Sequence, residues 1–265
     1  MVDPDSKLLV LTTPKGGATV TAHLVFEYLN LTEKALSFSP WIHDYRTRVY
    51  DQFYKHEDVC RACKRGSEWT CLFIIRSPAD RVVSSFIHVL HDDKLRPGKD
   101  PSFFDYVQKL LDLRRDETLR FPDGHHVAPQ NYDCLENIHY VALEFLDEGL
   151  RAFSDATGRR FGRKTNTSSF TSPHYVTKKH CSLDLSQTPF SLLPQEAFPA
   201  YDSFLENPDL NEALFCCIFD DDIAIYRHAC AQSWLMQRCP TCQARCNQEI
   251  NRLDALVQSC RSVVL

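Results

Sequence analysis

The chain has 265 residues, and its 35 acidic and 30 basic side chains give a formal net charge of −5. This balance disfavours a general nucleic-acid-binding surface, and the absence of an apolar run of about 18 residues predicts no membrane span. An apolar content of 43% is enough to bury the core of a single α/β domain. The polar residues 1–6 predict no secretory signal peptide.

The first predicted element is a buried strand, since residues 8–11 are Leu-Leu-Val-Leu. A proline and two glycines between residues 14 and 17 end this strand. From Thr19 onward, apolar residues recur every three or four positions, which predicts an amphipathic helix. The turn therefore places Lys15 beside a helix N-terminus, where free N–H groups favour a bound phosphate or sulfate.

The next segments alternate short apolar runs with helical patterns. Residues 36–38 are predicted to be a short strand, and residues 41–53 a helix with mostly buried aromatic rings. A second strand, turn and helix then follow: residues 72–75 are apolar, Pro78 marks the turn, and a helical period continues to residue 90. Arg76 directly follows this strand, so the sequence predicts a second anion-binding turn.

These two turns resemble the donor-binding motifs of sulfotransferases that use 3′-phosphoadenosine 5′-phosphosulfate (PAPS). Residues 14–20, Pro-Lys-Gly-Gly-Ala-Thr-Val, resemble the PKxGxTx motif that binds the 5′-phosphosulfate. Residues 76–86 resemble the RDPxxRxxSxY motif that binds the 3′-phosphate, with Ser77 in place of the usual Asp and Phe86 in place of the usual Tyr. The resemblance implies that the donor is bound by Pro14, Lys15, Gly16, Gly17, Ala18, Thr19, Val20, Arg76 and Ser84. It also implies that Arg81 is an orienting residue or a structural ion pair.

Further along the chain, residues 103–115 are predicted to be a helix, residues 140–143 a buried strand, and residues 195–205 and 207–231 two more helices. The order of His-x-x-Pro-Gln at residues 126–130, Cys134, a strand and Glu144 resembles the Golgi carbohydrate sulfotransferases of the HNK-1, chondroitin and dermatan type. That resemblance implies a glycan hydroxyl as the acceptor, and it extends over roughly residues 8–226.

Transfer to a hydroxyl requires a base, and a neutral histidine is a suitable group near pH 7. His23 lies one helical turn after Thr19 and is the first candidate, because related heparan sulfotransferases carry a histidine just after this loop. His125, His126 and His43 are alternatives. Lys15 is expected to stabilise the bridging oxygen of the leaving nucleotide, and this scheme requires no metal.

Twelve cysteines are compatible with disulfides in an oxidising compartment. Cys60 with Cys63, and Cys239 with Cys242, have the CxxC spacing of half a zinc site, but the two pairs lie much farther apart than in a compact zinc module. The sequence leaves disulfides, structural zinc and free thiols as alternatives for these two cysteine pairs. Residues 237–265 are predicted to be a cysteine-rich extension after a sulfotransferase domain of residues 1–236.

The predicted fold is α/β: a P-loop-like three-layer fold with a central parallel sheet flanked by helices. The predicted function is transfer of a sulfuryl group from PAPS to a carbohydrate hydroxyl, in the Golgi lumen if an N-terminal anchor is missing and otherwise in the cytoplasm. A P-loop-like nucleotide kinase is one alternative, disfavoured because the Gly-x4-Gly-Lys-Ser/Thr order is missing. A non-catalytic nucleotide- or glycan-binding protein that keeps the fold is the other.

Overall fold

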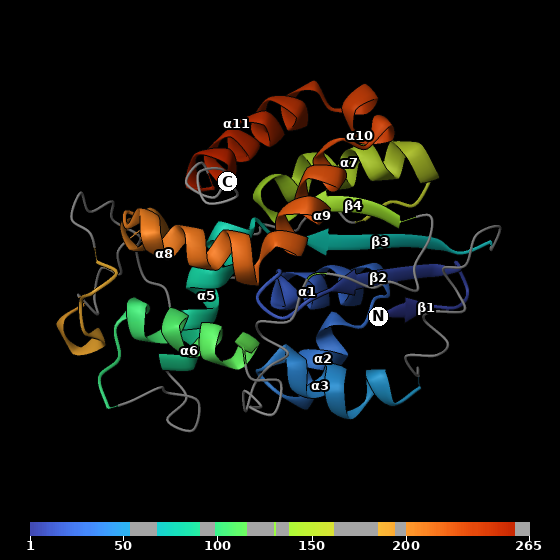
Figure 1. Cartoon of the computed structure of the whole chain (residues 1–265). Helices are drawn as coiled ribbons and strands as arrows, with labels where there is room; N and C mark the ends of the chain where they lie inside the picture. The colour runs from blue at the N-terminus through green and yellow to red at the C-terminus, as the bar shows by residue number, and fades with distance from the viewer. Residues whose placement is uncertain are drawn as a thin grey trace. The chain divides into compact units, whose positions relative to one another are not determined.

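The computed structural model (Figure 1) describes residues 1–53, 68–90, 99–115, 130, 138–161, 185–193 and 200–257. Two compact units divide the chain. Unit 1 consists of Met1–Arg76, Gln130–Phe170 and Tyr226–Asn247. Unit 2 consists of Ser77–Pro129, Thr171–Ile225 and Gln248–Leu265. Each unit is therefore assembled from three separate stretches of sequence.

Unit 1 contains a sheet with the strand order β1-β2-β3-β4. Its strands are β1 (Val2–Asp3), β2 (Leu8–Thr12), β3 (Thr70–Ile75) and β4 (Ile138–Ala142). β1 is antiparallel to β2, whereas β2, β3 and β4 are parallel, so the carboxyl ends of these three strands meet at one edge. This mostly parallel sheet confirms the α/β class and the predicted buried strands at residues 8–11 and 72–75. The third predicted strand, residues 140–143, is shifted: β4 ends at Ala142, and its first three residues are half-buried.

Helices cover the sheet of unit 1, and the composition of the strands explains why. β2 and β3 are near-continuous apolar runs, as is typical of parallel strands that are buried on both faces. One core cluster joins β2, β3 and β4 to α1 (Ala18–Tyr28) and α7 (Leu146–Thr157). Leu24 of α1, Ile74 of β3 and Phe153 of α7 belong to this cluster. The packing fixes the ends of the strands relative to the start of α1.

A second core cluster packs α1 against α2 (Thr32–Phe38), α3 (Ile42–Arg48) and the 3₁₀ turn η1 (Tyr50–Phe53). The predicted helix at residues 41–53 corresponds to α3 and η1. The prediction that its aromatic rings are mostly buried holds for Tyr45 and Tyr50 but is wrong for Trp41 and Phe53, which are exposed. The prediction of a strand at residues 36–38 is wrong, because these residues form the last turn of α2. Three residues are too few to distinguish a strand from a helix by periodicity.

Unit 2 contains α5 (Pro78–Leu90), α6 (Phe103–Arg115) and α8 (Pro208–Ala213). The rings of Phe86, Phe103 and Phe204 pack together, with centroids 5.2, 5.7 and 5.9 Å apart. The bounds of α6 are those predicted from the sequence. In either unit, the helices within the described ranges are too short or too polar to cross a membrane.

The predicted helix at residues 207–231 is interrupted. Asn207 caps α8, because its side-chain oxygen accepts the Leu210 N–H at 3.1 Å. A π-turn, η7 (Leu214–Ile218), and Phe219 then separate α8 from α9 (Asp220–Cys230). Of the predicted helix at residues 195–205, the described part contains the 3₁₀ turn η6 (Tyr201–Phe204).

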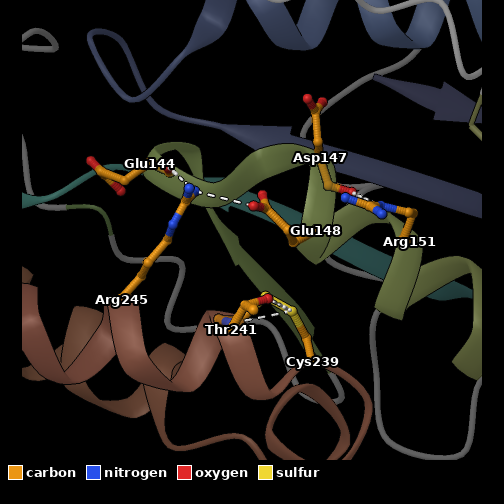
Figure 2. Close-up of a disulfide and its surroundings, with 8 residues drawn as sticks. Glu144, Asp147, Glu148, Arg151, Cys239, Thr241 and Arg245 are labelled. Carbon is orange, nitrogen blue, oxygen red and sulfur yellow. Dashed lines mark hydrogen bonds and ion pairs between the residues drawn. A yellow bond between two sulfur atoms is a disulfide. The ribbon is translucent and has the colours of Figure 1, made fainter.

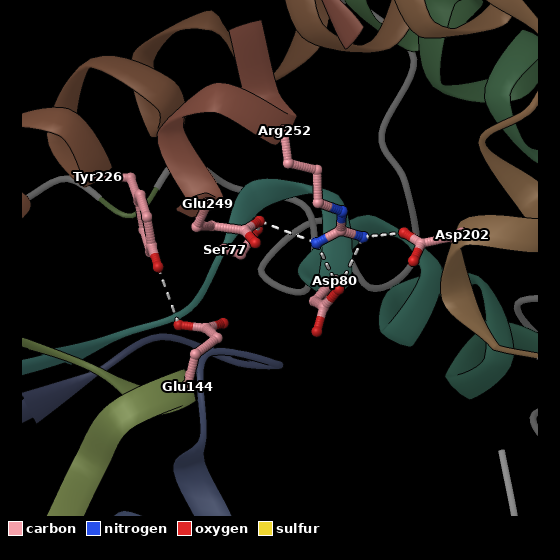
Figure 3. Close-up of polar contacts among 7 residues, drawn as sticks. All are labelled: Ser77, Asp80, Glu144, Asp202, Tyr226, Glu249 and Arg252. Carbon is pink, nitrogen blue, oxygen red and sulfur yellow. Dashed lines mark hydrogen bonds and ion pairs between the residues drawn. The ribbon is translucent and has the colours of Figure 1, made fainter. Parts of the chain in front are cut away.

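The chain continues through α10 (Ser233–Arg238) into α11 (Pro240–Leu256), which covers most of the predicted cysteine-rich extension. In unit 2, the side chain of Arg252 near the end of α11 pairs with Asp80 at 3.2 Å and with Glu249 at 2.9 Å, and it also pairs with Asp202 (Figure 3). These ion pairs tie the last turns of α11 to α5. The boundary at residue 237 stays a prediction from composition.

Candidate functional site

A tight turn of residues 13–17 connects β2 to α1 in unit 1. The Gly16 N–H donates to the Thr13 carbonyl at 3.0 Å. Lys15 and Gly17 have left-handed backbone angles, with φ of 61° and 105°. Gly17 is the N-cap residue of α1 and has no side chain that could accept from the first N–H groups of the helix. The start of this 11-residue helix therefore presents backbone donors and the positive end of the helix dipole to the turn.

Space and backbone angle favour glycine at two positions of this turn. A Cβ at Gly16 would lie 2.7 Å from Thr13 Oγ1 and 3.1 Å from Gln130 Oε1. A Cβ at Gly17 would lie 3.0 Å from Leu143 Cδ1, and any side chain there would be strained at φ 105°. The close path of the backbone through the turn therefore depends on these two residues.

We expect Gly17→Ala to lower the free energy of unfolding by about 2 to 3 kcal/mol. About 1 to 2 kcal/mol comes from the left-handed angle, and the rest from crowding against Leu143. Gly158→Ala is the matched control, because Gly158 also has a left-handed φ of 74° but a Cβ there would meet nothing within 4 Å. Urea denaturation of both variants measures the difference, and equal losses would contradict the crowding.

Arg76 directly follows β3 and reaches the same turn, since its Nη1 donates to the Lys15 carbonyl at 3.3 Å. The buried side chain of Gln130 links the two strand ends. Its Nε2 donates to the Arg76 carbonyl at 2.9 Å, and its Oε1 accepts the Arg76 N–H at 3.0 Å and the Thr13 hydroxyl at 3.4 Å. The Lys15 turn and Arg76 thus lie side by side at the carboxyl edge of the sheet.

His43, on α3, contacts the first turn of α1. Its Nε2 lies 2.9 Å from Thr19 Oγ1. Burial, followed by the charges of Arg46, His23 and Lys15, lowers the pKa of His43 to about 4, against the opposing effect of Asp44. Burial also lowers the pKa of His23. Both rings are therefore neutral near pH 7, and each has one nitrogen that can accept a proton.

Most of the donor-binding residues expected from the sequence lie in unit 1, which contains the whole turn of residues 14–20 together with Arg76. His23 lies on α1 in the same unit, and its charge, when it is protonated, lowers the pKa of His43. Ser84 lies in α5 of unit 2, where it is only 4% exposed. Its predicted contact with the 3′-phosphate stays a prediction.

Two predicted catalytic residues, His125 and His126, lie outside the described residues. Conversely, sequence reasoning gave no role to Gln130, which appeared only as the last residue of His-x-x-Pro-Gln. A buried amide side chain that hydrogen-bonds the end of a distant strand produces no recognisable periodicity or spacing in the sequence. The contact of His43 with Thr19 likewise has no signal in the sequence, which places His43 only among the alternative bases.

Arg81 belongs to a buried ion pair in unit 2. Its Nη1 lies 2.5 Å from Oδ2 of Asp222, and both side chains are fully buried. The guanidinium also lies 5.7 Å from the ring centroid of Phe219. These contacts confirm the interpretation of Arg81 as a structural ion pair. The second motif therefore supplies one arginine to the fold of unit 2 and another, Arg76, to the turn of unit 1.

A cavity of about 300 Å³ lies at the amino-terminal end of α7 in unit 1. It is lined by Leu143, Glu144, Phe145, Leu146, Asp147, Glu148, Arg151 and Arg245. Arg245 Nη1 lies 3.2 Å from Glu148 Oε1 and donates to the Glu144 carbonyl at 3.4 Å (Figure 2). The Tyr226 hydroxyl donates to the Glu144 carboxylate at 3.2 Å (Figure 3). Because Glu144 follows β4, this carboxylate lies at the same sheet edge as the Lys15 turn.

Comparison with protein-family models, with curated proteins and with solved structures finds no match for this chain. The class of this protein is therefore defined by its fold and by the arrangement of its candidate site. It is an α/β protein in which two strand ends place a lysine turn, a helix N-terminus and an arginine at the carboxyl edge of a mostly parallel sheet. Ligands of open α/β sheets bind at this edge.

Proposed function

We propose that the protein is a PAPS-dependent sulfotransferase that transfers a sulfuryl group to a carbohydrate hydroxyl, with a P-loop-like three-layer fold. The observation that carries the proposal is the contact of the Arg76 guanidinium with the Lys15 carbonyl. It joins two cationic residues from separate motifs at one sheet edge. A nucleotide with phosphate groups on both the 3′ and 5′ sides of its ribose suits two such groups.

The proposed reaction is an in-line displacement at sulfur. The acceptor oxygen forms a bond to the sulfur while the bond from sulfur to the 5′-phosphate oxygen breaks, and that oxygen gains the negative charge. Lys15 stabilises this charge, and the N–H groups at the start of α1, with the Thr19 hydroxyl, hold the 5′-phosphate. Arg76 pairs with the 3′-phosphate.

A histidine takes the proton of the acceptor hydroxyl. We assign this role to His43, because its Nε2 lies 2.9 Å from Thr19 at the donor turn. His23, one helical turn after Thr19, is the alternative. Burial, followed by neighbouring charges that include Lys15, lowers the pKa of His43, so a proton on His43 is easily passed on once transfer is complete.

The low pKa of His43 predicts an unusual pH dependence. We expect transfer to persist well below pH 6.5 and to fall only as the pH approaches about 4, because His43 stays neutral until then. His43→Gln should lower the rate about 10²-fold and remove this acid limb, whereas His23→Gln is the matched variant that should keep it. Initial rates between pH 4 and 8 measure both, and the reverse pattern would identify His23 as the base.

The same titration affects stability in a known direction. An unfolded His43 binds a proton near its ordinary pKa of 6.5, whereas the folded residue does so only near 4. The unfolded state therefore holds more protons between these values, and the folded protein loses stability as the pH falls from 6.5 towards 4. Thermal denaturation should show a smaller loss over this range in His43→Gln than in the wild type.

An exposed aromatic surface next to His43 supports a carbohydrate acceptor. The ring centroid of Trp41 lies 5.3 Å from that of His43, and Trp41 is 61% exposed. Phe38, the last residue of α2, is 49% exposed. The negative face of an aromatic ring attracts the partly positive C–H groups of a sugar ring. An acceptor stacked on Trp41 would have its hydroxyls near His43.

Disulfide bonds support a lumenal location, which we propose to be the Golgi. Cys239 is bonded to Cys242, and Cys71 and Cys216 each take part in a disulfide as well. Such bonds persist in oxidising compartments and are rare in the cytosol. Imaging of the tagged full-length protein tests this placement, and a diffuse cytosolic signal would contradict it.

Transfer of ³⁵S from labelled PAPS to a panel of glycans tests the proposed function. We expect label on at least one glycan, without any need for ATP. Label on small phenols but not on glycans would correct the acceptor class. Hydrolysis of ATP that depends on magnesium would favour the kinase alternative, and binding of the nucleotide without transfer to any acceptor would favour a non-catalytic protein.

A further inference from the structure

The sequence Cys239-Pro240-Thr241-Cys242 leads into α11, and its two cysteines form a disulfide with each other (Figure 2). In this bonded state neither sulfur is a zinc ligand, and neither links α11 to another segment. The sequence separation is only 3, so the bond restricts the unfolded chain less than a long-range bond would. A role in stabilising the C-terminal extension by cross-linking therefore does not explain this disulfide.

The surroundings of Cys239 stabilise a sulfur that carries negative charge. Cys239 immediately precedes α11, a helix of 17 residues that has Pro240 at its first position. The Cys242 N–H donates to Cys239 Sγ at 3.2 Å, and the Thr241 hydroxyl lies 3.3 Å from the same sulfur. A thiolate accepts such hydrogen bonds more strongly than a disulfide sulfur does, and the helix dipole favours it further. These contacts therefore stabilise the reduced state.

The two cysteines also differ in exposure. Cys239 is 7% exposed, whereas Cys242 is fully buried. An external thiolate would therefore attack Cys239, and Cys242 would be the leaving group. A third cysteine of the same helix, Cys246, is fully buried and is a free thiol. Because Cys246 lies away from the helix N-terminus, its reactivity is the internal reference for that of Cys239.

We propose that Cys239 and Cys242 form a reversible thiol–disulfide exchange site that is reduced by a dithiol. A thiolate of the dithiol attacks Cys239 Sγ, a mixed disulfide forms, and Cys242 leaves as a thiolate that takes up a proton. The second thiol of the reductant then attacks its own sulfur in the mixed disulfide, and Cys239 leaves. The reductant becomes a disulfide, and the protein gains two thiols.

Differential alkylation of the full-length protein across a dithiothreitol series tests this proposal. Free thiols are blocked with a light reagent, the remaining disulfides are reduced and labelled with a heavy one, and each cysteine is read by mass spectrometry. We expect Cys239 and Cys242 to be half reduced at a dithiothreitol concentration about tenfold lower than Cys71 requires. Removal of dithiothreitol should restore the pair. Reduction only together with Cys71 would overturn the proposal.

A Cys242→Ser variant separates the two sulfurs. It should capture a labelled monothiol disulfide at Cys239, whereas Cys246→Ser should behave as the wild type does throughout. Capture at Cys246 but not at Cys239 would contradict the assignment of the attacked sulfur. The wild-type titration needs neither variant and no sulfotransferase activity, so failure of the proposed function would leave this test intact.

Discussion

Lys15→Ala is expected to lower sulfuryl transfer by about 10³-fold or more while leaving the protein folded. The ammonium group of Lys15 stabilises the negative charge that develops on the leaving oxygen in the transition state, and alanine cannot supply this stabilisation. The backbone should not respond, because lysine and alanine both carry a Cβ and meet the same cost at a φ of 61°. Single-turnover rates with labelled PAPS, together with circular dichroism, measure the two effects.

Lys7→Ala is the matched control for this substitution. Lys7 also has a left-handed φ, of 52°, and it pairs with Glu68 at an exposed position. Loss of such a pair changes stability by about 0 to 1 kcal/mol, and Lys7 has no place in the proposed reaction. We expect wild-type transfer from Lys7→Ala. Equal transfer by the wild type and Lys15→Ala would contradict the role of Lys15.

Arg81→Ala is expected to destabilise the protein by about 3 to 5 kcal/mol. The substitution removes from the buried carboxylate of Asp222 the guanidinium that lies 2.5 Å from it, and loss of one partner from a buried ion pair is costly. Arg48→Ala is the control, because Arg48 is 72% exposed and pairs with Asp44 at 3.8 Å. We expect that variant to lose less than about 1 kcal/mol. Urea denaturation compares the two.

A double variant distinguishes the loss of charge pairing from the loss of packing. Arg81→Met with Asp222→Leu replaces both buried charges with apolar side chains of similar size, so it should recover most of the stability lost in Arg81→Ala. A double variant as unstable as Arg81→Ala would show that side-chain shape, rather than the loss of the Arg81–Asp222 ion pair, sets the cost. Arg81 would then stabilise the protein mainly through packing and less through its ion pair.

The parts of the fold that the sequence predicts are those in which one local signal dominates. The apolar runs at residues 8–11 and 72–75 lie in β2 and β3, and α6 has the predicted bounds 103–115, because period and length agree in these segments. The short run at residues 36–38 carries no usable period. There α2 is held by the packing of Ala35 against α1, a tertiary contact.

The candidate site divides in the same way. Lys15, Gly16 and Gly17 could be predicted, because a strand, a glycine turn and a helix N-terminus are adjacent in the sequence. The position of His43 depends on how α3 packs against α1, and that of Gln130 on a contact with Arg76 across 54 residues. Such contacts follow from the packed fold, and no single segment encodes them.

Calorimetric titration with adenosine 3′,5′-bisphosphate, compared with adenosine 5′-monophosphate, tests most directly whether the Lys15 turn and Arg76 form one donor site. The wild type should bind the bisphosphate at least about tenfold more tightly, because a charge-assisted pair with Arg76 contributes about 1.5 to 3 kcal/mol. Arg76→Ala should bind the two nucleotides equally. An undiminished preference for the bisphosphate in Arg76→Ala, or no preference in the wild type, would contradict the account.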